Sequence, residues 1–234
     1  MTPISFDSVA PAGATPFLSP SVAIAPGEVV RILGKRMGPS AITTGVIASG
    51  VLAGGVGGVQ VTFDGIPAPL LSVSAQEIDL ITPFELAGKS AATVQIQYNG
   101  AKSNPVQIAV TSMAVEILAL LNEDFTFNSA TNPAKPGSVM TMYLSGAGQT
   151  NPPGQDGQIN HAPLAVAAAP IQLSWFELDP GRGVTVLPVT FAGAAPGLAA
   201  GILQVNFIAP QQSLTGINLR VGDTGGARLN IAVQ

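Results

Sequence analysis

One stretch of the sequence has the residue types of a phosphate-binding loop. From residue 26 to 39 the chain reads PGEVVRILGKRMGP, in which Gly34 and Lys35 follow a hydrophobic run. A Walker loop requires a glycine five positions before its Gly-Lys pair and a Ser or Thr after the lysine, and here those positions hold Val29 and Arg36. The pattern therefore indicates a strand followed by an exposed turn rather than a phosphate site.

A second stretch, NEDFTFN at residues 122–128, resembles a calcium loop because oxygen-bearing side chains alternate along it. An EF-hand loop has glycine at its sixth position and glutamate at its twelfth, where this chain has Phe127 and Pro133. A solvated polar hairpin is the favoured interpretation, and a calcium site is the alternative. The residues concerned are Asn122, Asp124, Thr126 and Asn128.

Nucleophilic and metal chemistry have few candidate residues. The chain has no cysteine, which excludes disulfides, thiolate metal sites and a cysteine nucleophile. His161 is the sole histidine, so a zinc-binding histidine cluster cannot form within one chain. A Ser–His–Asp triad would have to use His161, and the sequence YLSGAG around Ser145 does not match the G-x-S-x-G motif. We predict no catalytic residue, metal ligand or cofactor.

Carboxylate pairs are harder to judge, because their pairing is spatial. The acidic residues lie mostly at turns, where they favour turn geometry without a catalytic role. A carboxylate-based hydrolase is therefore the third of the functions considered. The turn residues are Asp64, Asp156, Asp179 and Asp223.

Trp175 and Phe176 are the best candidates for a ligand-binding platform. Adjacent strand residues face opposite sides of a sheet, so one of the two could be exposed. The alternation of Ile171, Leu173 and Trp175 favours the other interpretation, in which Trp175 packs in the core.

Composition limits the class of protein. The 234 residues are 47% hydrophobic and 9% charged, with a net charge of −4, which is too hydrophobic for a disordered chain. The nine Lys and Arg residues are scattered, so we predict no nucleic-acid partner. The first residues lack the basic start and apolar core of a signal peptide.

Residues 41–61 are uncharged and about long enough to span a bilayer. Their many glycines weaken helix formation, so we predict a flexible loop leading into a strand near Val59 to Phe63, with no membrane insertion.

The elements that must position these residues are strands. Residues 94–98 (VQIQY) and 106–110 (VQIAV) alternate apolar and polar side chains around the turn signal Asn99-Gly100, and Asp64-Gly65 marks a second hairpin. Pro and Gly recur every 8–12 residues or so, the spacing of antiparallel sandwiches. The predicted fold class is all-β.

Three sequence patterns occur twice in the same order, which predicts two copies of one unit. The first is PGEVVRILGKRMG at residue 26 and PGSVMTMYLSGAG at residue 136; Lys35 and Arg36 correspond to Ser145 and Gly146, so the shared element does not need the cations. The others are EIDLITP with QVNFIAP, and VQIAV with LNIAV. Each copy has the size of an immunoglobulin-like sandwich. We predict domains at 1–112 and 113–234, the second with longer loops.

The opening stretch resembles the first strand and turn of IPT/TIG domains, which are immunoglobulin-like. The whole chain resembles the C-terminal domain family of large secreted Solibacter and other acidobacterial proteins. The departures are Glu77 and Asp79, where the family usually has Gln and Asn, and a hairpin at 177–183. The resemblance implies two tandem immunoglobulin-like (IPT/TIG-type) β-sandwiches outside the cell or on its surface. It carries no established chemistry, so it transfers no functional residue. The matching runs are GVQVTFDGIPAPLLSVSAQEIDLITP, LNEDFTFNSATNPAKPGSVMTMYLSGAGQTNPP and GAAPGLAAGILQVNFIAP.

The sequence therefore predicts a non-enzymatic structural or interaction module of an exported bacterial protein. Such a module would space or display other domains, or contact a protein or glycan on a surface. The alternative is a carbohydrate-binding accessory module that uses Trp175 or Phe176. Oligomeric state and the stiffness between the two units are left open by the residues alone.

Overall fold

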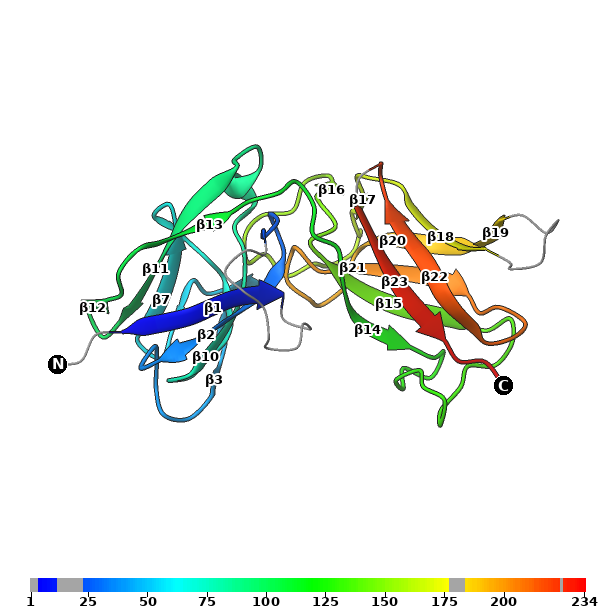
Figure 1. The fold of residues 1–234 in the computed structure, drawn as a ribbon, viewed down its shortest axis with the longest axis horizontal. Coiled ribbons are helices and arrows are strands. Elements are labelled where there is room, and N and C mark those ends of the chain that lie inside the picture. The colour runs from blue at the N-terminus through cyan, green and yellow to red at the C-terminus, as the bar shows by residue number, and fades with distance from the viewer. Residues whose placement is uncertain (1–3, 12–22, 177–183, 224) are drawn as a thin grey trace.

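The computed structural model describes residues 4–11, 23–176, 184–223 and 225–234 (Figure 1). Regular structure in these ranges consists of antiparallel strands and one 3-10 turn at Phe84–Leu86. The predicted all-β, immunoglobulin-like class is confirmed. Within the same ranges, no helix has the length and apolar character needed to cross a membrane.

Two sheets pack face to face in the N-terminal half. One has the order β1-β2-β10-β9-β3, and the other has β12-β11-β7-β6 with β13 paired to β11 and β8 to β7. Apolar side chains such as Ile32, Leu80, Phe63 and Ile96 are fully buried between them. The bounds are Ser5–Pro11 (β1), Val29–Lys35 (β2), Thr43–Thr44 (β3), Gly55–Val56 (β6), Val59–Phe63 (β7), Ile66–Pro67 (β8), Leu70–Val73 (β9), Glu77–Ile81 (β10), Ala91–Tyr98 (β11), Ala101–Lys102 (β12) and Val106–Ala109 (β13).

The C-terminal half has a second pair of sheets, with the orders β14-β15-β21-β20-β17-β16 and β19-β18-β22-β23. Its separate core contains Met140, Met142, Phe207, Ile217 and Leu219. The bounds are Glu116–Leu121 (β14), Val139–Ser145 (β15), Thr150–Asn151 (β16), Val166–Ala167 (β17), Ile171–Phe176 (β18), Val184–Leu187 (β19), Val189–Ala194 (β20), Leu203–Ile208 (β21), Leu214–Val221 (β22) and Gly225–Ile231 (β23).

The two halves have corresponding strand orders. The run β1-β2-β10-β9 corresponds to β14-β15-β21-β20, and β8-β7-β11-β13 corresponds to β19-β18-β22-β23. Backbone angles agree at matched positions: φ is 70° at Gly27 and 74° at Gly137, and 59° at Arg36 and 62° at Gly146. Arg36 therefore lies in a left-handed turn that glycine adopts more easily.

Two hairpin turns follow directly from their residue pairs. Asp64-Gly65 and Asn99-Gly100 all have positive φ, between 47° and 84°. This is the geometry that a two-residue hairpin turn of the right twist requires, and that Asn, Asp and Gly tolerate best. The predicted hairpins are confirmed, with β7 paired to β8 and β11 paired to β12.

The sequence predicted a flexible loop before Val59, whereas the structure has short strands in this segment. Residues 43–56 contain four short strands, which include the hairpin of β4 (Ile47–Ala48) and β5 (Val51–Leu52). Ser49 and Gly50 at its tip have φ of 51° and 77°, so glycine here permits a tight turn instead of disorder. The hairpin also contacts the second sandwich, which stabilises it further.

Candidate functional site

Trp175, one of the two candidate platform residues, is partly buried. It continues the face of the fully buried Leu173 on β18 and packs against the second core. The side chain of Phe176 and the hairpin at 177–183 lie outside the described residues. A cleft of about 520 Å³ borders β18, β19 and β22, and Val186 lines it while Trp175 does not.

His161 and Ser145 are not brought together. His161 is exposed in a loop, where its Nδ1 lies 3.3 Å from the carbonyl oxygen of Ala162. Ser145 is fully buried, and its hydroxyl has no hydrogen-bond partner among the described residues. A serine nucleophile needs a base within hydrogen-bond reach, which this arrangement does not provide.

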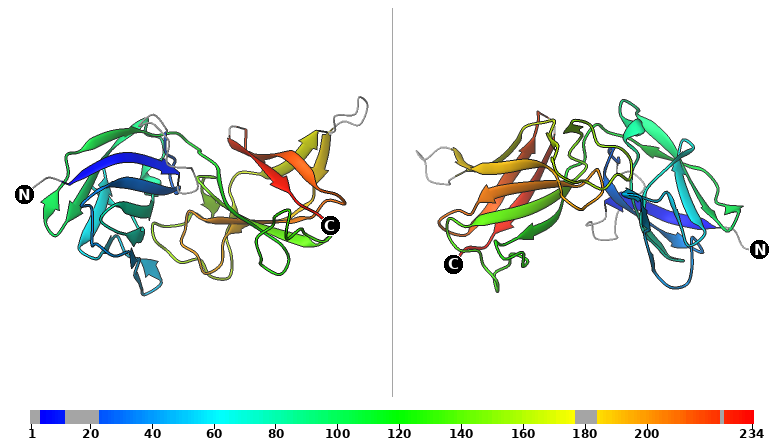
Figure 2. Two further views of the ribbon diagram at one scale, coloured as in Figure 1. Left: turned by 60° about the horizontal axis from the view of Figure 1, so that its bottom comes forward. Right: turned by 180° about the vertical axis from the view of Figure 1, so that it is seen from behind.

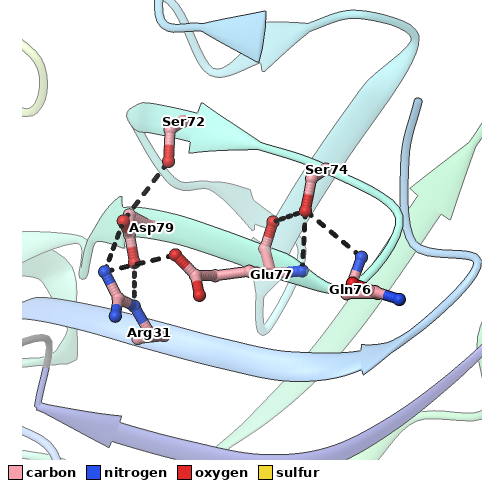
Figure 3. A network of polar contacts seen from close by, with 6 residues as sticks. All are labelled: Arg31, Ser72, Ser74, Gln76, Glu77 and Asp79. Carbon is pink, nitrogen blue, oxygen red and sulfur yellow. Dashed lines mark hydrogen bonds and ion pairs between the residues drawn. The ribbon is translucent and has the colours of Figure 1, made fainter. Parts of the chain in front are cut away.

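Glu77 and Asp79, which the sequence marked only as departures from a family pattern, both pair with Arg31 (Figure 3). The Arg31 Nε donates to Oδ1 of Asp79 at 2.8 Å and Nη2 lies 3.2 Å from Oε1 of Glu77. Ser72 also donates to Asp79, at 3.3 Å. The hydrogen bond to Asp79 raises the pKa of Arg31. Acidic residues at alternate strand positions opposite an arginine could have revealed this network, whose role is to join β2, β9 and β10.

A buried apolar cluster joins the two sandwiches, which lie next to each other along the long axis (Figure 2). Gly201 shows how close they come: a Cβ there would lie 2.6 Å from the carbonyl oxygen of Gly27. We call this contact the junction. Its buried apolar members are Val29, Leu52 and Ile81 from the first sandwich and Ala195, Ala199 and Ile202 from the second.

Main-chain hydrogen bonds also cross the junction. The N–H of Leu52 donates to the carbonyl of Gly157 at 2.7 Å, and that of Ile159 donates to Gly50 at 2.8 Å. These bonds attach the β4-β5 hairpin to the second sandwich. Apolar, well-packed contacts of this kind are the ones that restrict motion between domains.

The junction contains a buried carboxyl group, Glu28. Its Oε2 accepts a hydrogen bond from the N–H of Ala25 at 2.6 Å, and its side chain lies against Gly146 of the second sandwich. Burial raises the pKa of Glu28 from 4.5 to about 8; the Ala25 N–H lowers it, and the negative charge of Glu116 on β14 raises it. The Glu28 carboxyl is therefore largely protonated at neutral pH.

A second carboxyl pair crosses the junction nearby. Asp156, from the second sandwich, accepts a hydrogen bond from the N–H of Phe84 at 3.0 Å and lies beside Glu85. Burial raises the pKa of Asp156 to about 6; the Phe84 N–H lowers it, and the hydrogen bond and charge of Glu85 raise it. The cavity beside Phe84 has a volume of about 10 Å³, enough for a single water at most. These carboxyl groups thus take part in the contact between the two sandwiches.

The oxygen-rich loop at 122–128 turns its polar side chains toward one another. The hydroxyl of Thr126 donates to Oδ1 of Asp124 at 2.6 Å, and Nδ2 of Asn128 donates to Oδ1 of Asn122 at 2.9 Å. In the part of the chain that the structure describes, no three His, Cys, Asp or Glu residues gather as a metal site would require. The loop borders a cleft of about 330 Å³ that extends to Gln234.

Comparison with known proteins adds little. No protein-family model matches the chain, and no curated protein does. A surface glycan-binding protein from Prevotella bryantii is 11% identical with a TM-score of 0.32, over 99% of this chain and 42% of that one. The full extracellular region of plexin A4, domains 1 to 10, is 10% identical with a TM-score of 0.26, over 99% and 16%. The chain spans less than half of either structure, and at these TM-scores neither supports a functional argument.

Proposed function

We propose that the chain is a non-enzymatic structural module of an exported or cell-surface bacterial protein, which spaces other domains or contacts a surface partner. The buried junction is the observation that supports this proposal, because an apolar contact with main-chain hydrogen bonds across it would hold the two sandwiches as one stiff unit. The strand β1 begins at one end of the long axis, and the C-terminal residues lie in the other sandwich (Figure 1). A stiff pair would hold groups attached at its ends at a set separation.

We propose further that the chain is a tandem pair of IPT/TIG-type domains, residues 1–112 and 113–234. The corresponding strand orders and the separate cores support this division. The extracellular location rests on the resemblance to secreted acidobacterial proteins. The absence of clustered basic residues is the reason for expecting no nucleic-acid partner.

Pulsed electron–electron double resonance, which measures the distance between two spin labels, tests the spacing role. Because the chain has no cysteine, Lys102→Cys and Asp223→Cys on opposite sandwiches can be labelled without side reactions. A stiff junction gives a single narrow distance distribution. A broad distribution, as two domains on a flexible linker would give, would contradict the proposal.

The earlier alternatives have less support. A carbohydrate platform at Trp175 is disfavoured because this partly buried side chain packs against the core. Glycan binding that is lost on Trp175→Ala would favour that alternative again. A hydrolase at the junction would need its carboxylates in an open cleft, whereas Glu28 is fully buried. Hydrolysis of a chromogenic glycoside that is abolished by Glu28→Gln would restore that function.

A further inference from the structure

We propose that the cleft beside residues 122–138, here called the Asn122 cleft, binds a neutral oligosaccharide. Its volume of about 330 Å³ is at the lower end of the range for small-molecule sites and suits one or two sugar rings. This inference names a ligand class for the interaction role proposed above, and it rests on that role but not on the stiffness of the junction. The polar side chains that line the cleft include Asn122, Glu123, Asp124, Lys135, Ser138 and Gln234.

The lining matches the chemistry of a polyol. Each sugar hydroxyl both donates and accepts a hydrogen bond, so a site for it needs acceptors and donors close together. Glu123 and Asp124 supply acceptors, Lys135 supplies a donor, and the amide of Gln234 supplies both. Such a mixed lining favours a hydroxyl-rich ligand over an apolar one.

The loop that shapes the cleft is held in place before any ligand arrives. Asn128 pairs with Ala232 through two hydrogen bonds, of 2.8 Å from its Nδ2 and 2.9 Å to its Oδ1. Asn132 donates to the hydroxyl of Thr126 at 2.6 Å and to the carbonyl of Phe127 at 3.0 Å. A site that is ordered in advance loses less entropy on binding. In Figure 1 the green loop after β14 lies beside the red C-terminal segment.

Two phenylalanines on this loop face solvent. Phe125 and Phe127 are 68% and 71% exposed, although aromatic side chains normally contribute most when buried. Phe125 also has a φ of 62°, an uncommon backbone angle for a bulky residue. The C–H face of a sugar ring is apolar and stacks on an aromatic face. Phe125 directly follows Asp124, which lines the cleft. An aromatic face on this loop and the polar cleft would together supply both halves of sugar recognition.

The position of the cleft in the fold indicates whether it suits a soluble ligand or another sandwich domain. The ends of the two sandwiches that carry the Pro-Gly pairs, at residues 26–27 and 136–137, correspond in sequence; we call them the Pro-Gly ends. The first is covered by the junction, which includes Glu28 and contacts at Phe84. At the second, the corresponding residues are Ser138 and Gln211. The second Pro-Gly end therefore lacks the buried carboxyl and the aromatic ring that pack at the first end. This difference favours a hydrated ligand there over a packed domain.

The charges favour a neutral ligand. Glu123 and Asp124 outnumber Lys135 in the lining, so an anionic glycan would be repelled. Hydrogen bonds from Thr126 lower the pKa of Asp124, which keeps its carboxylate ionised over a wide pH range.

The test begins with an array of neutral and acidic oligosaccharides (glucans, xylans, mannans, galactans and uronic-acid polymers) and ends with calorimetric titration of the strongest ligand. We expect binding to neutral members, with a Kd that changes less than about twofold between low and high salt. Phe127→Ala should weaken binding at least about tenfold, the effect of losing an aromatic anchor. Glu123→Gln and Phe125→Ala should also weaken it. Circular dichroism would check that each variant is folded.

Val186→Ala is the matched control, because this valine is also exposed and lines a different cleft, the one beside β18. It should leave the Kd unchanged. Absence of binding to every neutral oligosaccharide, binding only to acidic ones, or binding that persists in both phenylalanine variants would each overturn the proposal. Self-association of the chain that Phe127→Ala abolishes would instead assign the cleft to a second copy. A negative glycan result together with a narrow spin-label distance would leave the spacing role standing.

Discussion

The Pro-Gly ends of the two sandwiches have the same backbone and different surroundings. The N–H of Gly27 donates to the carbonyl of Thr82 at 3.0 Å, and the N–H of Gly137 donates to that of Ala209 at 3.2 Å. The next residue is Glu28 in the first sandwich, fully buried at the junction, and Ser138 in the second, beside an open cleft. The same local scaffold therefore forms a domain contact in one sandwich and borders an open cleft in the other.

The same contrast extends to the apolar residues at this end. Val29 is 5% exposed because the second sandwich covers it, whereas Val139 at the corresponding position is 37% exposed. Burial of an apolar side chain stabilises in proportion to the area removed from water. The first sandwich therefore depends on its neighbour at a position where the second does not.

The largest expected difference in the free energy of unfolding comes from placing a charge at each of these two valines. Val29→Asp should lower the free energy of unfolding by at least about 4 kcal/mol, because an unpaired carboxylate would be buried in the junction. Val139→Asp should cost less than about 1 kcal/mol at its more exposed position. Denaturant unfolding followed by circular dichroism measures both. Equal losses would show that the two ends are not differently covered.

The second prediction concerns the pH dependence of the junction. Because the pKa of Glu28 is raised in the folded chain to about 8, the folded state binds its proton more tightly than the unfolded state does. The resulting stabilisation is complete below about pH 4.5 and is lost as the pH rises through 8. The loss between about pH 5 and 8 should be on the order of 3 kcal/mol.

Unfolding curves of the Glu28→Gln variant across this pH range isolate the effect, since the variant cannot titrate at this position and should lack that part of the slope. Ser138→Glu gives the matched control: a glutamate at the open end should keep an ordinary pKa and add no such slope. If wild type and Glu28→Gln lost stability in parallel, Glu28 would not be the responsible group. The pKa of Asp156 is also raised, so this residue should add a smaller loss of stability as the pH rises through about 6.

The third prediction compares the turns after β2 and β15. Gly146 has a φ of 62°, and a Cβ there would overlap the carbonyl oxygen of Ala114, so Gly146→Ala should cost about 2 to 3 kcal/mol. Arg36 already has a side chain at the same φ, and Arg36→Gly should change stability by less than about 1 kcal/mol. Thermal unfolding of the two variants measures the difference. If Gly146→Ala left the stability unchanged, the backbone at Ala114 would be able to move away from the new Cβ atom.

The smallest effect is expected where β2 and β10 carry charges and β15 and β21 do not. Arg31 lies opposite Asp79, and the matched pair is Thr141 opposite Asn206, with a hydrogen bond of 3.3 Å. Replacing both charged residues by the neutral ones, Arg31→Thr with Asp79→Asn, should cost less than about 1 kcal/mol, because partly exposed ion pairs contribute little. A double-mutant cycle gives the coupling energy. A coupling above about 2 kcal/mol would show that this network stabilises more than its exposure suggests.

Much of the fold could be predicted because its signals are local. Alternating side chains identified β11, and the Asn99-Gly100 pair identified its hairpin, since both depend on neighbours along the chain. The short strands between residues 43 and 56 were missed because glycine-rich sequence is equally suited to tight turns and to loops. The loop at 122–128 was singled out from its oxygen-bearing side chains, as a polar hairpin or a calcium loop, but its cleft and the exposure of Phe125 and Phe127 were not predicted. Both depend on the distant C-terminal residues that pack beside the loop.

By itself, the sequence determined the all-β class, the hairpin turns and the pairs of recurring patterns, because residue type and spacing restrict backbone angles directly. Only the tertiary structure decided that Glu28 is buried against Gly146 while Ser138 borders a cleft, and that Asp156 meets Glu85. These contacts join residues about 70 to 120 positions apart along the chain. Their burial and pKa depend on which surfaces meet, a property that local sequence patterns do not contain.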